Sequence, residues 1–127
     1  MTTFKLTLSV LPLELSVAQW PAAAELPALK GEFFSLTRTP GELSLVCETR
    51  FLAPEVRHEA GWRAFRLHGP FEFTLTGLLV SVLEPLRAAG IGIFALSTYD
   101  TDYVLVKESH LTTAIAALRG AGHTVHP

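Results

Sequence analysis

Charge and cysteine are both scarce in this sequence of 127 residues. Charged residues make up 17% of the chain, with 10 lysines and arginines against 12 acidic residues, so we expect no basic surface that neutralises phosphates and no nucleic-acid partner. The single cysteine, Cys47, cannot form an intrachain disulfide, which fits a reducing cytoplasm. Because no apolar run reaches the roughly 18 residues of a membrane span and the first residues lack a signal-peptide pattern, we expect a soluble cytoplasmic protein with no membrane partner.

Motifs for catalysis and for metal binding are also missing. The sequence holds no phosphate-binding loop, no nucleophile elbow and no dinucleotide fingerprint, and its glutamates are not spaced for acid–base catalysis. None of the five histidines has the spacing of a known zinc motif. His123 and His126 are close in sequence, but this is a weak signal, and we interpret the histidines as solvated. We therefore expect a protein that is not an enzyme and that needs neither cofactor nor metal.

The first half of the chain alternates like a series of strands. Every second residue of Phe4–Val10 is apolar, which predicts a half-buried strand. The apolar parity reverses at Leu11-Pro12, which predicts a bulge or a bend there. Residues 18–31 contain two prolines and a glycine and are interpreted as a loop. Two further strands, over residues 32–38 and 42–48, flank a Thr-Pro-Gly stretch with the composition of a turn.

The second half predicts helices alternating with strands. Apolar residues at helical spacing predict a helix over Gly77–Ala89, capped by Thr74 or Thr76, with Pro85 loosening its last turn. A second helix is predicted after Ser109, whose hydroxyl suits a cap. The strands predicted around these helices are 62–67, 91–97, 103–107 and 123–126. The stretch 91–97 is so apolar that we expect a central strand.

These elements follow one another in the order β-α-β-β-α-β, the ferredoxin-like pattern of an α+β fold. In this fold two helices pack on one face of an antiparallel sheet. The charged, proline-containing stretch 53–61 separates this part from the first half. We therefore predict a degenerate N-terminal lobe over residues 1–60 and a C-terminal βαββαβ lobe over residues 61–127. The 49% of hydrophobic residues predicts burial against a second copy, most simply in a homodimer.

Two stretches resemble a known family. Residues 96–107, LSTYDTDYVLVK, are similar to the signature of ACT domains in the cytosolic arginine sensor and its bacterial relatives. Residues 33–40, FFSLTRTP, resemble the N-terminal part of the same proteins, and the spacing of Gly77 and Glu84-Pro85-Leu86 also fits. The resemblance implies a tandem of ACT lobes and a non-catalytic regulatory module. It also implies a small ligand, expected to be an amino acid, between lobes or between subunits.

The resemblance further implies which residues contact that ligand. They come from the loop into the first helix, the start of the following strand and the turn after it: Phe73, Thr74, Leu75, Thr76, Gly77, Gly92, Ile93, Thr98, Tyr99 and Asp102. Free N–H groups at a helix N-terminus suit a carboxylate, and Asp102 suits a cationic group. Arginine-selective members place acidic residues in the loop before the helix, where this chain has only Glu72. A different or smaller amino acid, or no ligand, therefore stays open.

Two other functions also stay open at this point. The domain could be purely structural or protein-binding, with its site closed by Phe73, Leu75 and Tyr99. It could instead be a small enzyme, because the ferredoxin-like scaffold supports many activities. The lack of a nucleophile or an acid–base pair argues against an enzyme. A regulated protein partner is expected, but the sequence does not identify it.

Overall fold

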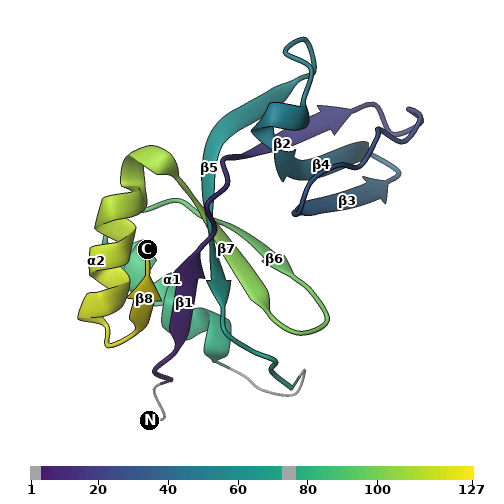
Figure 1. Cartoon of the computed structure of the whole chain (residues 1–127). Coiled ribbons are helices and arrows are strands. Elements are labelled where there is room, and N and C mark those ends of the chain that lie inside the picture. The colour runs from purple at the N-terminus through teal and green to yellow at the C-terminus, as the bar shows by residue number, and fades with distance from the viewer. Residues whose placement is uncertain (1–3, 73–76) are drawn as a thin grey trace. The chain divides into compact units, whose positions relative to one another are not determined.

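The computed structural model describes residues 4–72 and 77–127 (Figure 1). The chain folds into two compact units. Met1–Pro12 and Arg63–Pro127 form the unit that carries both α-helices, called here the helical unit; Leu13–Trp62 form the strand unit. Strand β5 (His58–Leu67) begins in the strand unit and ends in the helical unit. The chain therefore passes from the helical unit to the strand unit after Pro12, and it returns within β5, between Trp62 and Arg63.

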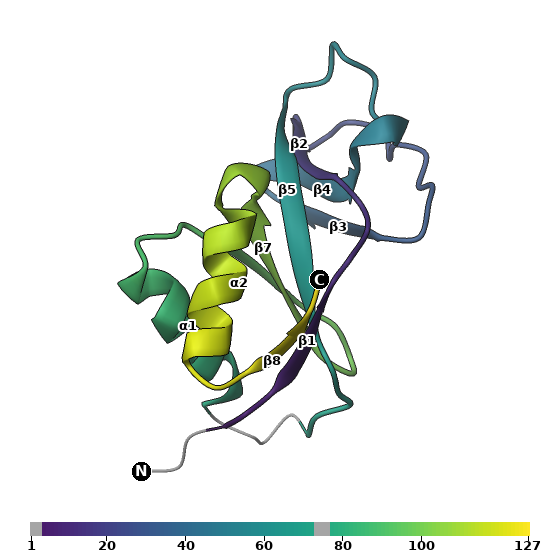
Figure 2. The same cartoon turned by 60° about the vertical axis from the view of Figure 1, so that its left-hand side comes forward.

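The helical unit confirms the predicted βαββαβ order. After β5 come α1 (Leu78–Ala88), β6 (Phe94–Ser97), β7 (Asp102–Lys107), α2 (Leu111–Gly120) and β8 (Thr124–His126). An additional strand, β1 (Thr7–Val10), pairs antiparallel with β5 and parallel with β8. The strand order is β8-β1-β5-β7-β6, so β1 lies inside this sheet and not in a separate lobe over residues 1–60. Figure 2 shows α1 and α2 side by side on one face of the sheet.

The core of the helical unit forms between this face of the sheet and the two helices. Its buried members are Leu8, Phe65, Leu67, Val82, Leu86, Ile91, Val104, Val106, Ala114, Leu118 and Val125. Leu8 is fully buried while its neighbours in β1 are partly exposed, which confirms the alternation predicted for the first segment. Burying such a side chain contributes about 1.5–3 kcal/mol, so the register of β1 is firmly specified. Among the described residues, no helix combines the length and the apolar character that crossing a membrane requires.

Both helices end at a glycine in the left-handed conformation, Gly90 after α1 and Gly122 after α2. At the end of α1, the N–H of Gly90 donates to the Arg87 carbonyl (2.9 Å) and the N–H of Ile91 to the Leu86 carbonyl (3.0 Å). These two bonds define a Schellman motif, which needs a left-handed residue at Gly90 (φ 75°). The same pair of bonds closes α2 around Gly122. Each glycine thus redirects the chain into the next buried residue or strand.

The helix starts differ from the predicted caps. The residue before α1 is Gly77, in a left-handed conformation (φ 83°) and without a side-chain cap bond. Thr74 and Thr76 lie outside the described residues. The prediction of Ser109 as cap was wrong, because a 3-10 turn (Glu108–His110) comes first and His110 takes the N-cap position. A serine hydroxyl can cap a helix only from the N-cap position, and Ser109 lies one residue before it.

The apolar stretch 91–97 does not form a central strand. Strand β6 covers only Phe94–Ser97 and pairs with β7 alone, so it is an edge strand of the described sheet. Its residues alternate between half-buried and exposed. Ile91 is buried, but it belongs to the Schellman motif after α1. The continuous apolar run therefore combines a helix-end contact with an edge strand.

The strand unit confirms the predicted hairpin. It contains β2 (Leu15–Trp20), β3 (Phe34–Thr39), β4 (Glu42–Glu48), a 3-10 turn (Thr49–Phe51) and the start of β5, in the order β3-β4-β2-β5. The Thr39 hydroxyl accepts hydrogen bonds from the N–H groups of Gly41 (3.1 Å) and Glu42 (3.2 Å) and so shapes the hairpin turn. Residues 18–20 continue β2 and are not part of the predicted loop. Whether this unit is a degenerate ACT lobe stays a prediction.

A buried carboxylate organises the loop before β3. Glu48 is 2% exposed; its Oε2 accepts a hydrogen bond from the Glu32 N–H (2.7 Å), and its Oε1 lies 3.1 Å from Arg50 Nε. Gly31 has a left-handed φ of 90°, and a Cβ there would lie 2.0 Å from Glu48 Oε2. The loop therefore requires glycine at this position and the carboxylate behind it.

Candidate functional site

A cavity of about 270 Å³ opens in the helical unit between the start of α1 and the turn that joins β6 to β7. Its lining comes from three segments that are distant in sequence: Phe71, Glu72, Gly77, Leu78, Leu79, Val80, Ser97, Thr98, Tyr99, Asp100, Thr101 and Asp102. The structure thus brings together four of the predicted site residues, namely Gly77, Thr98, Tyr99 and Asp102. This cavity is the candidate ligand site.

Local hydrogen bonds fix the shape of the β6–β7 turn. The N–H of Thr98 donates to the Thr101 carbonyl (2.8 Å), and the Thr98 hydroxyl contacts both the carbonyl and the N–H of Thr101. Just before the turn, the Ser97 hydroxyl donates to the Asp102 carboxylate. Ser97 and Asp102 also face each other in the strand register. The Asp102 carboxylate is therefore held at the rim of the cavity by its cross-strand neighbour.

Further bonds tie this turn to the segment after β5. The Thr101 hydroxyl donates to the Leu67 carbonyl (2.6 Å), and the N–H of Phe71 donates to the Asp100 carbonyl (2.9 Å). The two backbones approach so closely that a Cβ on Gly69 would lie 2.9 Å from the Asp100 carbonyl oxygen. A glycine at position 69 is what allows the contact. The sequence alone did not indicate this role of Gly69, because Asp100 comes from a different segment.

The opposite wall is the first turn of α1. The first N–H groups of a helix have no partner within the helix, and the helix dipole gives this end a positive potential. Gly77 provides no capping side chain, and Gly77, Leu78, Leu79 and Val80 of this turn line the cavity. This wall suits a carboxylate.

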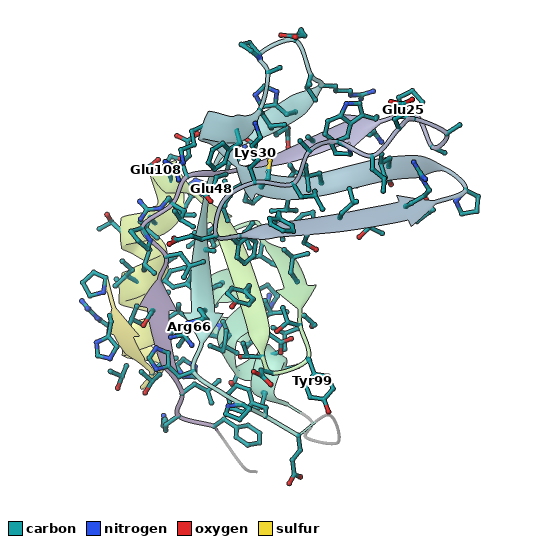
Figure 3. All side chains as sticks on the ribbon, turned by 45° about the vertical axis from the view of Figure 1, so that its right-hand side comes forward. Glu25, Lys30, Glu48, Arg66, Tyr99 and Glu108 are labelled. Carbon is teal, nitrogen blue, oxygen red and sulfur yellow. The ribbon has the colours of Figure 1, made fainter. Side chains whose placement is uncertain are left out.

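The side chains around the cavity are acidic. Glu72, Asp100 and Asp102 contribute three carboxylates, and no lysine, arginine or histidine is among the described residues that line it. The basic residue nearby, Arg66, lines a neighbouring cavity of about 200 Å³ that shares Thr98, Asp100 and Thr101 with the first (labelled in Figure 3). The candidate site therefore presents anionic side chains on one wall and a helix N-terminus on the other.

The other predicted site residues are not gathered here. Gly92 and Ile93 precede β6 and do not line the cavity, and a Cβ on Gly92 would meet no described atom within 4 Å. Gly92 lies in an open connection and not in a strand, so no neighbouring strand comes close to it among the described residues. Phe73, Thr74, Leu75 and Thr76 lie outside the described residues. Whether any of these six residues contacts a ligand stays a prediction.

Tyr99 does not close the site. Its side chain is 83% exposed and projects from the turn (Figure 3). The sequence signal for the remaining cavity residues was weak, because Phe71, Leu79 and Val80 look like ordinary loop and helix positions. Among the residues of the α1 wall of the cavity, only the glycine directly before the helix, Gly77, was a signal that the sequence offered.

The sequence suggested that the histidines are solvated, but this is wrong for at least one of them. His123 is 5% exposed and hydrogen-bonded through both ring nitrogens. His68 contacts the Ser9 hydroxyl (2.6 Å), and its ring centre lies 5.9 Å from that of His126. Within residues 4–72 and 77–127, no three histidine, cysteine or acidic side chains come together as a metal site would require.

Comparison with known proteins identifies the family to which this fold belongs. The family model described as ACT domain matches residues 57–120. The human cytosolic arginine sensor for mTORC1 subunit 1 is 31% identical over 104 residues, which cover 68% of this chain and 30% of the sensor. The chain spans 57% or less of the first curated relatives that it matches. The chain belongs to the ACT domain family.

Solved structures agree with this fold. Protein Atu0741 from Agobacterium tumefaciens superposes with a TM-score of 0.91 at 38% identity, covering 97% of this chain and 93% of that one. The aspartate kinase of Clostridium acetobutylicum, named as an allosteric enzyme, superposes with a TM-score of 0.68 at 11% identity, covering 96% of this chain and 36% of that one. The second likeness concerns the fold alone. Together they support the ferredoxin-like ACT fold.

Proposed function

We propose that this chain is a non-catalytic regulatory module whose cavity at the start of α1 binds a free amino acid. The observation that carries the proposal is the pairing of a helix N-terminus with three carboxylates around one cavity of about 270 Å³. This volume is just below the roughly 300–1,000 Å³ typical of small-molecule pockets, so it suits a ligand of amino-acid size. Relatives named as an arginine sensor and as an allosteric aspartate kinase support a regulatory role.

The charges favour one orientation of the ligand. The α-carboxylate would lie at the first turn of α1, where N–H groups and the helix dipole attract anions. The ammonium groups would face Asp102, Asp100 and Glu72. A ligand with a cationic side chain satisfies more of these carboxylates than a neutral one. We therefore expect a basic amino acid to bind more tightly than a neutral amino acid of the same length.

A thermal-shift screen with the twenty amino acids tests this proposal. L-Lysine and its uncharged counterpart L-norleucine form the matched ligand pair. A ligand at about 100 times its Kd stabilises the folded protein by about 2.7 kcal/mol, which would raise Tm by roughly 10 °C. A rise with L-lysine that exceeds the rise with L-norleucine supports the orientation above. No shift with any amino acid would favour the alternative, a structural or protein-binding ACT domain.

Variants then locate the ligand. Asp102→Asn keeps the side-chain shape and the acceptor for Ser97 but removes the charge, so L-lysine should bind roughly fivefold more weakly, as expected for a half-exposed ion pair. Glu55→Gln, an exposed acid in the strand unit, is the matched control and should change nothing. Gly92→Val separates two site models: a ligand confined to the cavity is unaffected, whereas one that reaches Gly92 is blocked. Calorimetry measures all three.

The regulatory part of the proposal involves partners. A ligand that favours one arrangement of two ACT units shifts the population toward it, and such a shift would be transmitted to a regulated protein. Self-association as a homodimer and a cytoplasmic location are part of the same proposal. Exposed apolar side chains of the strand unit support self-association: Leu26, Leu29, Phe34 and Phe51.

A further inference from the structure

His123 is a buried histidine that joins three elements of the helical unit. It follows α2 and precedes β8, and only 5% of its surface is exposed. The N–H of Leu6 donates to its Nδ1 (3.0 Å), and its Nε2 lies 2.8 Å from the Ser81 carbonyl oxygen. A nitrogen that accepts a hydrogen bond carries no proton, so the proton of the neutral ring lies on Nε2 and is donated to Ser81. Two backbone groups thus fix both the tautomer and the orientation of the ring.

The Ser81 carbonyl needs this donor because of Pro85. In an α-helix each carbonyl accepts from the N–H four residues later, and for Ser81 that residue is Pro85. Proline has no N–H, so it leaves the Ser81 carbonyl without its helical partner. An unsatisfied buried carbonyl is costly, and His123 Nε2 takes the place of the absent N–H.

This contact lies directly behind one wall of the candidate site. Ser81 closes the first turn of α1: its N–H donates to the Gly77 carbonyl (3.0 Å) and its hydroxyl to the Leu78 carbonyl (2.6 Å). Residues 77–80 of the same turn line the cavity. In Figure 2, α1 lies on the helix-bearing face of the sheet that contains β1 and β8. A hydrogen bond to Ser81 therefore anchors the cavity wall to the sheet.

We propose that His123, in its Nε2–H tautomer, is a positioning residue of the ligand site. It does not touch the ligand. It holds the first turn of α1 at a fixed distance from β1 by supplying the hydrogen bond that Pro85 cannot make. The expected effect on ligand affinity rests on the proposed function. The tautomer of His123, and its replacement of the N–H that Pro85 lacks, do not depend on any ligand.

Nitrogen NMR of the histidine rings in the full chain tests the tautomer. The expected spectrum shows a protonated Nε2 and an unprotonated Nδ1 for His123 at neutral pH. A protonated Nδ1 would overturn the proposal, whatever the ligand results are.

Substitutions test the positioning. His123→Leu should move the amide signals of residues 78–81, lower Tm by roughly 10 °C and weaken L-lysine binding about tenfold. Adding Pro85→Ala gives the Ser81 carbonyl a helical N–H, so the double variant should return these amide signals toward the parent positions and recover most of the affinity. If the double variant recovers neither the amide positions nor the affinity, the proposal is refuted, because the hydrogen bond to the Ser81 carbonyl then does not position the first turn of α1.

His123→Gln is the conservative variant, because its amide can accept from Leu6 and donate to Ser81. It should retain more affinity and a higher Tm than His123→Leu, and it replaces that variant if leucine prevents folding. If L-lysine and the other amino acids do not bind the parent protein, the proposed function fails. The tautomer and the amide-signal rescue then still decide the role of His123.

Discussion

Gly69→Ala is the sharpest test of how the candidate site is built. A Cβ at this position would lie 2.9 Å from the Asp100 carbonyl oxygen and 3.2 Å from the Phe71 nitrogen. Both atoms belong to the backbone, so no flexible side chain can move aside. The β6–β7 turn and the segment after β5 would have to separate. This separation stretches or breaks the 2.9 Å hydrogen bond between Phe71 and Asp100.

The expected cost follows from these two effects. Overpacking a tight contact costs about 1–3 kcal/mol, and a lost backbone hydrogen bond costs about 1 kcal/mol. Gly69→Ala should therefore lower the free energy of unfolding by about 2–3 kcal/mol. Because Asp100 and Asp102 line the cavity, the affinity for L-lysine should fall as well.

Gly120→Ala is the matched control for Gly69→Ala. Gly120 is the last residue of α2, and a Cβ there meets no described atom within 4 Å. Alanine favours a helix over glycine by about 0.5–1 kcal/mol, so this variant should be as stable as the parent or more stable. Urea denaturation of both variants gives the comparison. Equal stabilities for the two variants would mean that the turn is not held by the close contact at Gly69.

Three further predictions concern the strand unit and self-association. Glu48→Ala leaves the Glu32 N–H without its buried acceptor and should lower the free energy of unfolding by about 2 kcal/mol in denaturation experiments. Burial, and secondly the nearby Glu48 carboxylate, raises the pKa of the Cys47 thiol. The neutral thiol therefore stabilises the folded state fully below the ordinary thiol pKa, and this contribution is lost as the pH rises through the raised value; slower alkylation of Cys47 than of a free thiol at pH 8 would agree. Light scattering should give a species of twice 13.8 kDa, and a monomer at all concentrations would contradict the homodimer.

Sequence reasoning succeeded where the structure depends on neighbours in the chain. The hairpin around Thr39, the two helices and their terminal glycines all rest on hydrogen bonds between residues a few positions apart. The β6–β7 turn belongs to the same class, because Ser97 to Asp102 hold their shape largely among themselves. Of the twelve residues that line the cavity, four were predicted: Gly77, Thr98, Tyr99 and Asp102.

The rest of the site depends on contacts that no local pattern contains. The close approach at Gly69 involves Asp100, from a different segment. The hydrogen bonds of His123 reach Ser81, 42 residues away, and Leu6, 117 residues away. Pro85 signalled a weakened helix, but nothing near it in sequence named the residue that compensates. The mistaken central strand has a similar cause, because apolar content alone does not distinguish an edge strand from a helix-end contact.

The bend predicted at Leu11-Pro12 is confirmed, because the backbone bends at Pro12 between β1 and β2, and this bend coincides with a change of core. On its N-terminal side, Leu8 is fully buried in the core of the helical unit. On its C-terminal side, Leu15 is fully buried in the strand unit, where β2 begins. In the pairing of β2 with β5, the register shifts between Leu15 and Val17, beyond the proline. The first alternation is therefore correct for the helical unit, whereas in β2 Ser16 and Ala18 are also fully buried and Val17 is only half-buried. The reversal still marks the place at which the chain leaves the helical unit for the strand unit. The chain thus passes from the helical unit to the strand unit after Pro12 and returns after Trp62, and only the second of these passages lies next to the charged stretch 53–61 that composition indicated as a boundary.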